Sequence, residues 1–172
     1  KDRVTIANNT IVIDVANPPV ITPTSINGVQ IVPVAAPPSS YCTSGTSTNG
    51  CVPSIFANAQ PSVTFANACT IGVSNVEGQK SGIAFYGTNN MGFSPAPWAT
   101  GSHSWLCVKA PTQRTTAQNS GGTTGLCDGT LTLDWNAFQM ANPTALGQPW
   151  MAGDKAYVQA WYRDPTAIKT TN

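Results

Sequence analysis

The chain has 172 residues, of which only 9% are charged, and its formal net charge is +1. Such a balance gives no electrostatic surface for nucleic acid, for an anionic membrane or for a strongly acidic partner. The length suits about one domain with its own core, and the bias toward Thr, Asn, Ser, Gly and Pro favours short strands and turns over solvated helices.

Residues 1–40 differ from the rest of the chain, because they are rich in strand-forming residues but contain no aromatic residue. Two alternating runs lie within 4–16, and their apolar positions are Val4, Ile6, Ile11, Ile13 and Val15. The parity of these positions switches at Asn8-Asn9, which predicts a bulge, a bend or separate partners for the two halves. A hairpin signal, Asn27-Gly28, follows within 20–35. We therefore expect an extended strand arm that has no core of its own and lies against another surface.

The remaining residues, 41–172, carry short strand-forming runs separated by turn residues. Strands are expected near 54–57, 62–66, 69–75, 82–87, 104–109, 130–135 and 156–163. Long loops are expected over 87–102 and 110–125, and one helical turn within 135–146 that Asn142-Pro143 ends. This pattern predicts an all-β fold, an antiparallel β-sandwich of Ig-like or jelly-roll-like type, preceded by the N-terminal arm.

The five cysteines are Cys42, Cys51, Cys69, Cys107 and Cys127. None lies in a Cys-x-x-Cys pair and the only histidine is His103, so the spacing supports neither a structural zinc site nor haem attachment. Disulfides, and hence an oxidising compartment, are the better interpretation. We expect Cys42–Cys51 to close a short loop and Cys107–Cys127 a longer one, although the sequence leaves other pairings open. Cys69 is then either buried as a small apolar residue or paired outside the chain.

No motif of nucleophilic, phosphate or dinucleotide chemistry occurs in the sequence. His103, between Ser102 and Ser104, is better interpreted as a polar residue at a strand entrance than as part of a catalytic set. Glycosidases need two carboxylates across a cleft, and the candidates, none with a defining context, are Asp128, Asp134, Asp154 and Asp164. Asp128 and Asp154 also lack the spacing of a calcium loop. We therefore expect a protein that is not an enzyme and that binds no cofactor and no metal.

The tryptophans divide into two groups by their sequence context. Trp105, Trp135 and Trp161 lie in alternating strand-like runs, which favours the core. Trp98 and Trp150 follow Pro97 and Pro149 in loops, and we expect them to be the exposed rings. Exposed aromatic faces beside polar groups bind sugars, so these two are the candidate ligand-facing residues.

Arg163 lies on a predicted strand of a weakly charged chain, and such an arginine needs a carboxylate partner. Asp134 or Asp128 can supply it, and the pair Arg163–Asp134 is the structural ion pair that we predict. Asp134 is otherwise expected as a strand-edge or turn residue, and Asp164, before Pro165, as a turn former.

Five segments after residue 40 carry a likeness to a known module. They are YCTSGTSTNGCVPSI (41–55), SNVEGQKSGIAFYG (74–87), WLCVKAPTQRT (105–115), NSGGTTGLCDGTLTLDWNAF (119–138) and LGQPWMAGDKAYVQAWYRDP (146–165). From Tyr41 onward the sequence resembles a C-terminal module of large secreted proteins of planctomycetes and myxobacteria-like bacteria. The resemblance implies an extracellular, disulfide-bearing, non-enzymatic domain.

The sequence departs from that module in two respects. Relatives continue after the Arg-Asp-Pro region with one further apolar strand, often ending near a cysteine, whereas this sequence ends at Asn172. Relatives also carry the module behind other domains, whereas here it follows the strand-rich arm. A sandwich without its last strand exposes unpaired backbone groups beside an open apolar groove.

The arm has the residues that such a groove would accept. We hypothesise that residues 3–16, or the 20–35 hairpin, of one chain complete the sheet of the next, with Ile11, Ile13 and Val15 filling the groove. Donor and groove lie on different parts of the chain, so the contact is heterologous and propagates into a filament.

The predicted partner is therefore a second copy of this chain, and the predicted location is extracellular or at the cell surface. In the alternative interpretation the arm folds back in cis, and the chain is a secreted module for adhesion or polysaccharide binding. Neither interpretation involves nucleic acid. No window approaches 18 consecutive apolar residues, so we also expect no membrane insertion.

Overall fold

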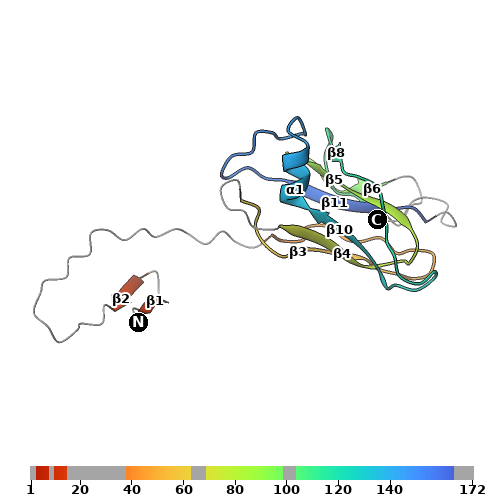
Figure 1. Cartoon of the computed structure of the whole chain (residues 1–172), viewed down its shortest axis with the longest axis horizontal. Helices are drawn as coiled ribbons and strands as arrows, with labels where there is room; N and C mark the ends of the chain where they lie inside the picture. The colour runs from red at the N-terminus through yellow and green to blue at the C-terminus, as the bar shows by residue number, and fades with distance from the viewer. Residues whose placement is uncertain (1–2, 8–9, 15–37, 63–68, 99–103, 165–172) are drawn as a thin grey trace, which may run out of the picture. The chain divides into compact units, whose positions relative to one another are not determined.

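The computed structural model describes residues 3–7, 10–14, 38–62, 69–98 and 104–164 (Figure 1). The chain divides into two compact units, Lys1–Val34 and Ala35–Asn172, and each is described here by itself. Of the sequence-based expectations, Val15, the 20–35 hairpin and most of the strand near 62–66 lie outside the described residues.

The first unit contains a β-hairpin. Its strands are β1 (Arg3–Ala7) and β2 (Thr10–Asp14), which pair antiparallel with Val4 opposite Ile13 and Ile6 opposite Ile11. Positions directly opposite each other belong to one face of a two-stranded ladder. The parity switch at Asn8-Asn9 therefore marks the reversal between two paired strands. Of the three predicted alternatives, a bend between the two runs fits this pairing.

The second unit contains two main antiparallel sheets. The first has the order β10-β4-β3, and its strands are β3 (Ser54–Ala57), β4 (Thr70–Val76) and β10 (Gly129–Asp134). The second has the order β11-β5-β8 with β9 also on β5, and its strands are β5 (Ser81–Gly87), β8 (Gln113–Arg114), β9 (Gln118–Asn119) and β11 (Tyr157–Tyr162). A short ladder joins β6 (Ala96–Pro97) to β7 (Trp105–Leu106). The predicted all-β class is confirmed.

The two sheets meet across a shared apolar core. Along β10, buried and exposed residues alternate, so that Leu131 and Leu133 point inward while their neighbours face solvent. From the second sheet, Ala84 and Tyr86 join Leu133 in one buried cluster, and Tyr162 joins Leu131 in another. Residues of both sheets therefore share the core clusters, and the sandwich of Ig-like or jelly-roll-like type stays a prediction.

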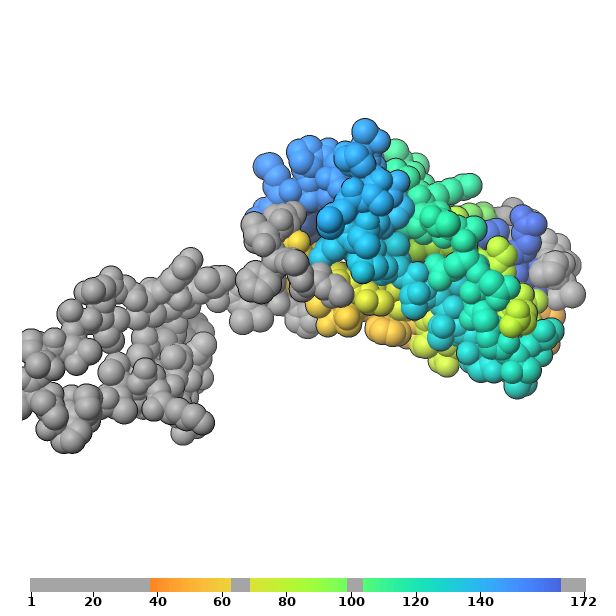
Figure 2. Space-filling model, in the orientation of Figure 1, coloured from red at the N-terminus to blue at the C-terminus, as the bar shows by residue number. Residues whose placement is uncertain are grey.

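One helix, α1 (Trp135–Ala141), follows β10 directly. Asp134 caps its first turn by accepting a hydrogen bond from the Ala137 N–H at 2.9 Å, and the helix ends at Asn142, as the sequence predicted. The Trp135 ring packs edge-on against Tyr86 at a centroid distance of 4.7 Å. The helix and the loop after it, blue in Figure 2, thus cover one end of the core.

Most of the expected strands appear within two residues of their expected bounds, and β3 matches its range. The expected strand over 104–109 is reduced to the two residues of β7. The expected loops contain short strands that the sequence did not indicate, namely β6, β8 and β9. Two-residue strands carry no alternation, so pattern reasoning has nothing to detect in them.

Candidate functional site: an apolar groove between two edge strands

Two strands, one from each sheet, form open edges on the same side of the second unit. Within the part of the chain that the structure describes, β3 pairs only with β4, and β11 pairs only with β5. The outer backbone groups of both strands therefore have no ladder partner among the described strands. Such an edge is a template for pairing with a further strand.

A groove of about 170 Å³ separates these two edges. Its floor and walls are the apolar side chains of three strands: Ile55 and Ala57 of β3, Ile71 and Val73 of β4, and Val158 and Ala160 of β11. A dry cavity of about 150 Å³ can hold a benzene molecule, so this groove has room for one or two aliphatic side chains. No carboxylate and no basic residue lines it, which makes it a site for apolar groups.

The segment that leads into the second unit runs along the groove. Residues 38–44 belong to its lining. The Ser40 hydroxyl donates to the Ile55 carbonyl at 3.2 Å, and the Ser44 hydroxyl donates to the Pro53 carbonyl. The Tyr41 ring packs edge-on against Tyr157 at 5.8 Å. The described part of this unit therefore begins at the rim of the groove.

Burial also affects the hydroxyl of Tyr41. Desolvation raises its pKa to about 12, an effect that a hydrogen bond with Asn90 partly opposes and that Tyr157 reinforces. The phenol is therefore neutral throughout the physiological range, as a residue beside an apolar groove should be.

Two disulfides hold this region, but their pairing differs from the expected one. The structure joins Cys42 to Cys107 and Cys51 to Cys127, so the predicted pairs Cys42–Cys51 and Cys107–Cys127 are wrong. Cys42 and Cys51 are close in the sequence but bond to cysteines of two different loops. The spacing of cysteines along the sequence cannot predict such a pairing. Two disulfides are typical of an oxidising, extracellular environment.

Cys69 is the free cysteine of the described residues, and it is buried in the core cluster with Trp135. Its thiol donates a hydrogen bond to the Ala59 carbonyl at 3.2 Å. Burial, reinforced by Asp134, raises the pKa of this thiol. The thiol therefore stays protonated, and of the two expectations the buried one is confirmed.

The tryptophans are placed differently from the sequence expectation. Trp150, which was expected to be exposed, is partly buried: it packs against Trp135 at 5.5 Å, and its indole N–H donates to Gln139 Oε1 at 3.0 Å. This packing needs the glycine at position 147, because a Cβ there would collide with the Trp150 ring. Trp135 is buried as expected.

Trp98 and Trp105 are the two half-exposed rings, each 37% exposed. Trp98 packs edge-on against Phe85 at 6.0 Å. Trp105 was expected in the core. In the ladder of β6 and β7, Trp105 stands opposite Pro97, so Trp98 and Trp105 occupy opposite faces of the ladder. They therefore do not form one shared stacking platform.

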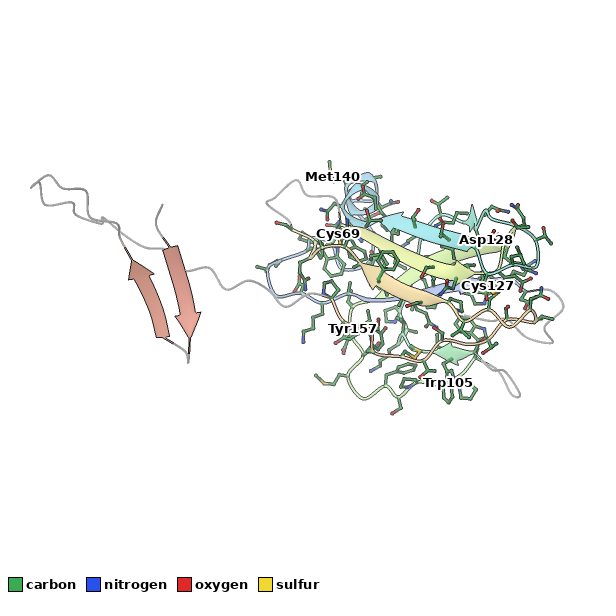
Figure 3. The ribbon with its side chains drawn as sticks, turned by 90° about the horizontal axis from the view of Figure 1, so that it is seen from below. Cys69, Trp105, Cys127, Asp128, Met140 and Tyr157 are labelled. Carbon is green, nitrogen blue, oxygen red and sulfur yellow. A yellow bond between two sulfur atoms is a disulfide. The ribbon has the colours of Figure 1, made fainter. Side chains whose placement is uncertain are left out.

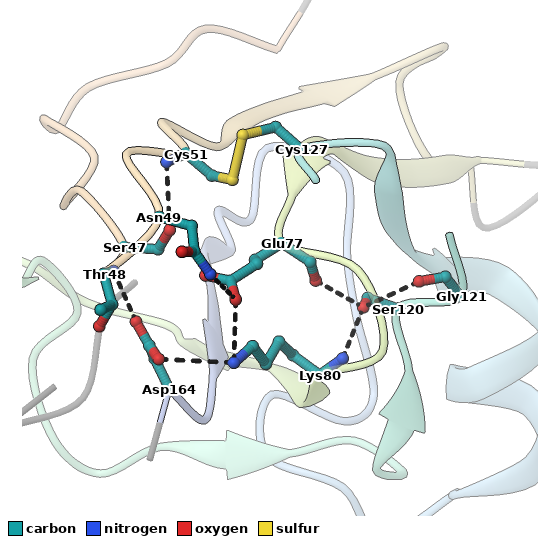
Figure 4. A network of polar contacts seen from close by, with 10 residues as sticks. All are labelled: Ser47, Thr48, Asn49, Cys51, Glu77, Lys80, Ser120, Gly121, Cys127 and Asp164. Carbon is teal, nitrogen blue, oxygen red and sulfur yellow. Dashed lines mark hydrogen bonds and ion pairs between the residues drawn. A yellow bond between two sulfur atoms is a disulfide. The ribbon is translucent and has the colours of Figure 1, made fainter. Parts of the chain in front are cut away.

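The predicted ion pair Arg163–Asp134 is replaced by other contacts. The carboxylate of Asp134 caps α1, and Arg163 has an exposed side chain, its backbone N–H donating to the Ser81 carbonyl at 2.8 Å. The ion pairs among the described residues instead join Lys80 to Glu77 at 3.0 Å and to Asp164 at 3.5 Å (Figure 4).

Asp164 thus has a different role from the expected turn former. It is buried, and its Oδ2 accepts a hydrogen bond from the Thr48 backbone N–H at 2.7 Å. The other loop carboxylates stabilise turns: Asp128 accepts from the Thr123 N–H and Asp154 from the Met151 N–H, both at 2.7 Å. The hydrogen bonds from Thr123 lower the pKa of Asp128.

The remaining expected positions and chemistries have no assigned role in the structure. His103 and Ser102 lie outside the described residues. In the described ranges, no group of three or more His, Cys, Asp or Glu residues could hold a metal ion. No helix that the structure describes is long and apolar enough to cross a membrane.

The chain matches no protein-family model, no curated protein and no solved structure.

The disulfide pairing can be tested by removing one bond. Each bond closes a loop of 65 or 76 residues, so the chain-entropy estimate for losing one of them is about 4 kcal/mol. We expect the double variant Cys51→Ala/Cys127→Ala, with the other bond intact, to have a free energy of unfolding lower by about 4 kcal/mol in urea denaturation.

A non-reducing peptide map of the unaltered protein provides the control. It should yield one peptide pair that contains Cys42 with Cys107 and another that contains Cys51 with Cys127. Recovery of Cys42 linked to Cys51 would contradict the structure.

Proposed function

We propose that this chain is an extracellular structural subunit that polymerises by donor-strand complementation. The single observation that carries the proposal is the apolar groove between the open edges of β3 and β11. In this assembly a strand from the N-terminal unit of one chain enters the groove of the next and pairs with an edge strand.

The energetics of the groove favour a strand as its occupant. A strand supplies two things at once: backbone donors and acceptors for an open edge, and alternate side chains for the apolar lining. Burying one aliphatic side chain contributes about 1.5–3 kcal/mol. Of the apolar positions in the arm, Ile11 and Ile13 lie on β2, and with Val15 they repeat at the spacing that a groove of this kind requires.

The hairpin of the first unit does not prevent this exchange. An isolated two-stranded hairpin has little stability in water, because it has no layer to pack against. The strand β2 can therefore give up its pairing with β1 and gain a larger apolar contact in the groove. In the assembly, Ile11 and Ile13 exchange their partners Ile6 and Val4 for groove residues.

The linker permits a partner in another chain. Residues 15–37 separate β2 from the described start of the second unit. An extended stretch of that length reaches at most roughly 80 Å, which is enough for a neighbouring subunit. Since donor and groove are different surfaces, each added subunit leaves one of each free, and growth is linear.

The alternative is a secreted module with the arm folded in cis, which binds polysaccharide or mediates adhesion. The half-exposed ring of Trp98 is the feature that favours it. Trp150, which supported it in the sequence, lies against the core cluster. A single ring gives a weaker stacking surface than two, so the groove is the better-supported site.

Deleting residues 1–16 tests the proposal. Without β1 and β2 the donor is missing, so we expect the deleted chain to be monomeric by light scattering and to show no filaments by electron microscopy. Adding a synthetic peptide of residues 3–16 should give a one-to-one complex with the deleted chain. Filaments formed by the deleted chain would rule out the arm as donor.

A groove variant tests the receiving surface. Ala160 lines the groove, and in Ala160→Arg a long charged side chain replaces a methyl group there, which should lower the peptide affinity at least tenfold. The matched control is Met140→Arg on α1, where the side chain is 84% exposed and projects from the surface (Figure 3). Both variants should keep the circular dichroism of the parent. Equal peptide affinity for the two variants would place the peptide elsewhere.

A further inference from the structure

A cluster of three charged side chains, two of them buried, lies at the end of the second sheet where β11 ends and β5 begins (Figure 4). Glu77 is 1% exposed, Asp164 is 2% exposed, and the Lys80 side chain between them is 16% exposed. The chain has only 15 charged side chains, as 8 basic plus 7 acidic, and Glu77 is its single glutamate. Burying three of them together is costly unless every one is closely paired.

The contacts around the cluster fix each carboxylate. Glu77 Oε1 lies 3.0 Å from Lys80 Nζ and accepts a hydrogen bond from Asn49 Nδ2 at 2.7 Å. Asp164 is held at its other oxygen, since Oδ2 accepts from the Thr48 N–H at 2.7 Å while Oδ1 lies 3.5 Å from Lys80 Nζ. The Lys80 amine thus lies beside the carboxyl groups of Glu77 and Asp164, whose orientations are fixed by these hydrogen bonds.

The backbone on either side is equally constrained. The Lys80 N–H donates to Ser120 Oγ at 2.9 Å, and the Ser120 hydroxyl donates to the Glu77 carbonyl at 2.8 Å. The disulfide Cys51–Cys127 lies next to the loop that carries Thr48. A partly buried amine whose Nζ lies 3.5 Å from an oxygen of a buried carboxyl group has both reactants of an amide condensation in place, and such positioning provides a high effective concentration.

We propose that Lys80 and Asp164 form an intramolecular isopeptide bond between Nζ and Cγ, with Glu77 as the group that transfers the protons. The bond would be a modification of the second unit, and it does not depend on the function proposed for the groove.

The condensation balances without any other reactant. Lys80 first gives one proton of its ammonium to Oδ1 of Asp164, which leaves a neutral amine beside a neutral carboxyl group. The amine attacks Cγ, and the Glu77 carboxylate takes a second proton from Nζ. Oδ2 carries the developing negative charge, and the Thr48 N–H, already bonded to it, stabilises that charge. The C–Oδ1 bond then breaks as Glu77 returns its proton.

The overall change is that an ammonium and a carboxylate become an amide and one water. Oδ1 leaves as this water, Oδ2 remains as the amide oxygen on Thr48, and Glu77 ends as it began. No electrons are exchanged, so no oxidant or reductant is needed.

The charges at rest are those of the ion pair. Burial alone would raise the pKa of Glu77, but hydrogen bonds from Lys80, Asn49 and Ser47 outweigh it and lower this pKa. The hydrogen bond to Glu77 likewise raises the pKa of Lys80. The state in which Lys80 and Asp164 are both neutral and can react is therefore only a small fraction of the molecules. A low population is sufficient for a bond that forms once in each chain.

The bond would have a mechanical effect on the edge strand β11. Lys80 directly precedes β5 and Asp164 follows β11 by two residues, and these strands pair antiparallel with Gly82 opposite Tyr162. A covalent link at this position would close the end of the β5–β11 ladder. The strand that borders the groove would then be unable to peel away from that end.

The mass of the intact full-length chain, reduced and denatured, tests the proposal directly. The expected result is a mass lower than that of the sequence by one water, together with a branched tryptic peptide that joins the Lys80 segment to the Asp164 segment. This measurement needs no variant, so a folding defect cannot obscure it. The full sequence mass with separate peptides would overturn the proposal and leave only an ion pair.

Variants separate the proposed bond from any other loss of water. Lys80→Arg and Glu77→Gln should restore the full mass, whereas Lys155→Arg, an exposed control, should keep the loss. Asp164→Asn should lose ammonia in place of water, because its leaving group is then an amide nitrogen. Persistence of the water loss in Lys80→Arg would also overturn the proposal. Circular dichroism checks that each variant is folded.

Discussion

The open edges of β3 and β11, which have no further strand partner among the described residues, are the constraint on which the rest of the second unit depends. A sheet edge presents donors and acceptors that need partners, and here the two edges border an apolar groove in place of a closed core. Ile55 on one side and Val158 on the other are only half-buried for this reason. The aromatic cluster around Trp135 closes the layers at one end, and the two disulfides tie the rim to distant loops.

Alternation and turn residues predicted much of the fold. The alternating burial along β10 and the end of the helix at Asn142 could both be predicted from the sequence, because each depends on a few neighbouring residues. The disulfide pairs and the packing of Trp150 were not, because they depend on which loops the fold brings together. The contact of Lys80 and Glu77 with Asp164 was not predicted for the same reason: Asp164 lies 84 residues from Lys80 in the sequence, and the only available signal was a single glutamate in a weakly charged chain.

The groove was inferred from the sequence by a different argument from the one that the structure supports. The sequence argument rested on a strand expected after Arg163. The structural argument rests on the strand orders β10-β4-β3 and β11-β5-β8, which leave open edges within the described residues. The first unit also changes the donor that we propose, because its residues form the paired strands β1 and β2 instead of one long strand. Complementation then requires a strand exchange, for which a marginally stable hairpin is suited.

Cross-linking between two differently marked chains tests donor-strand complementation most directly. One chain carries Ile13→Cys in the proposed donor and the other carries Val158→Cys in the groove, and the two are mixed, assembled and oxidised. The account predicts a disulfide-linked heterodimer on a non-reducing gel, and none when Met140→Cys replaces the groove variant. Absence of the heterodimer, with an internal cross-link in a chain that carries both Ile13→Cys and Val158→Cys, would contradict assembly between chains and establish the arm as folded in cis.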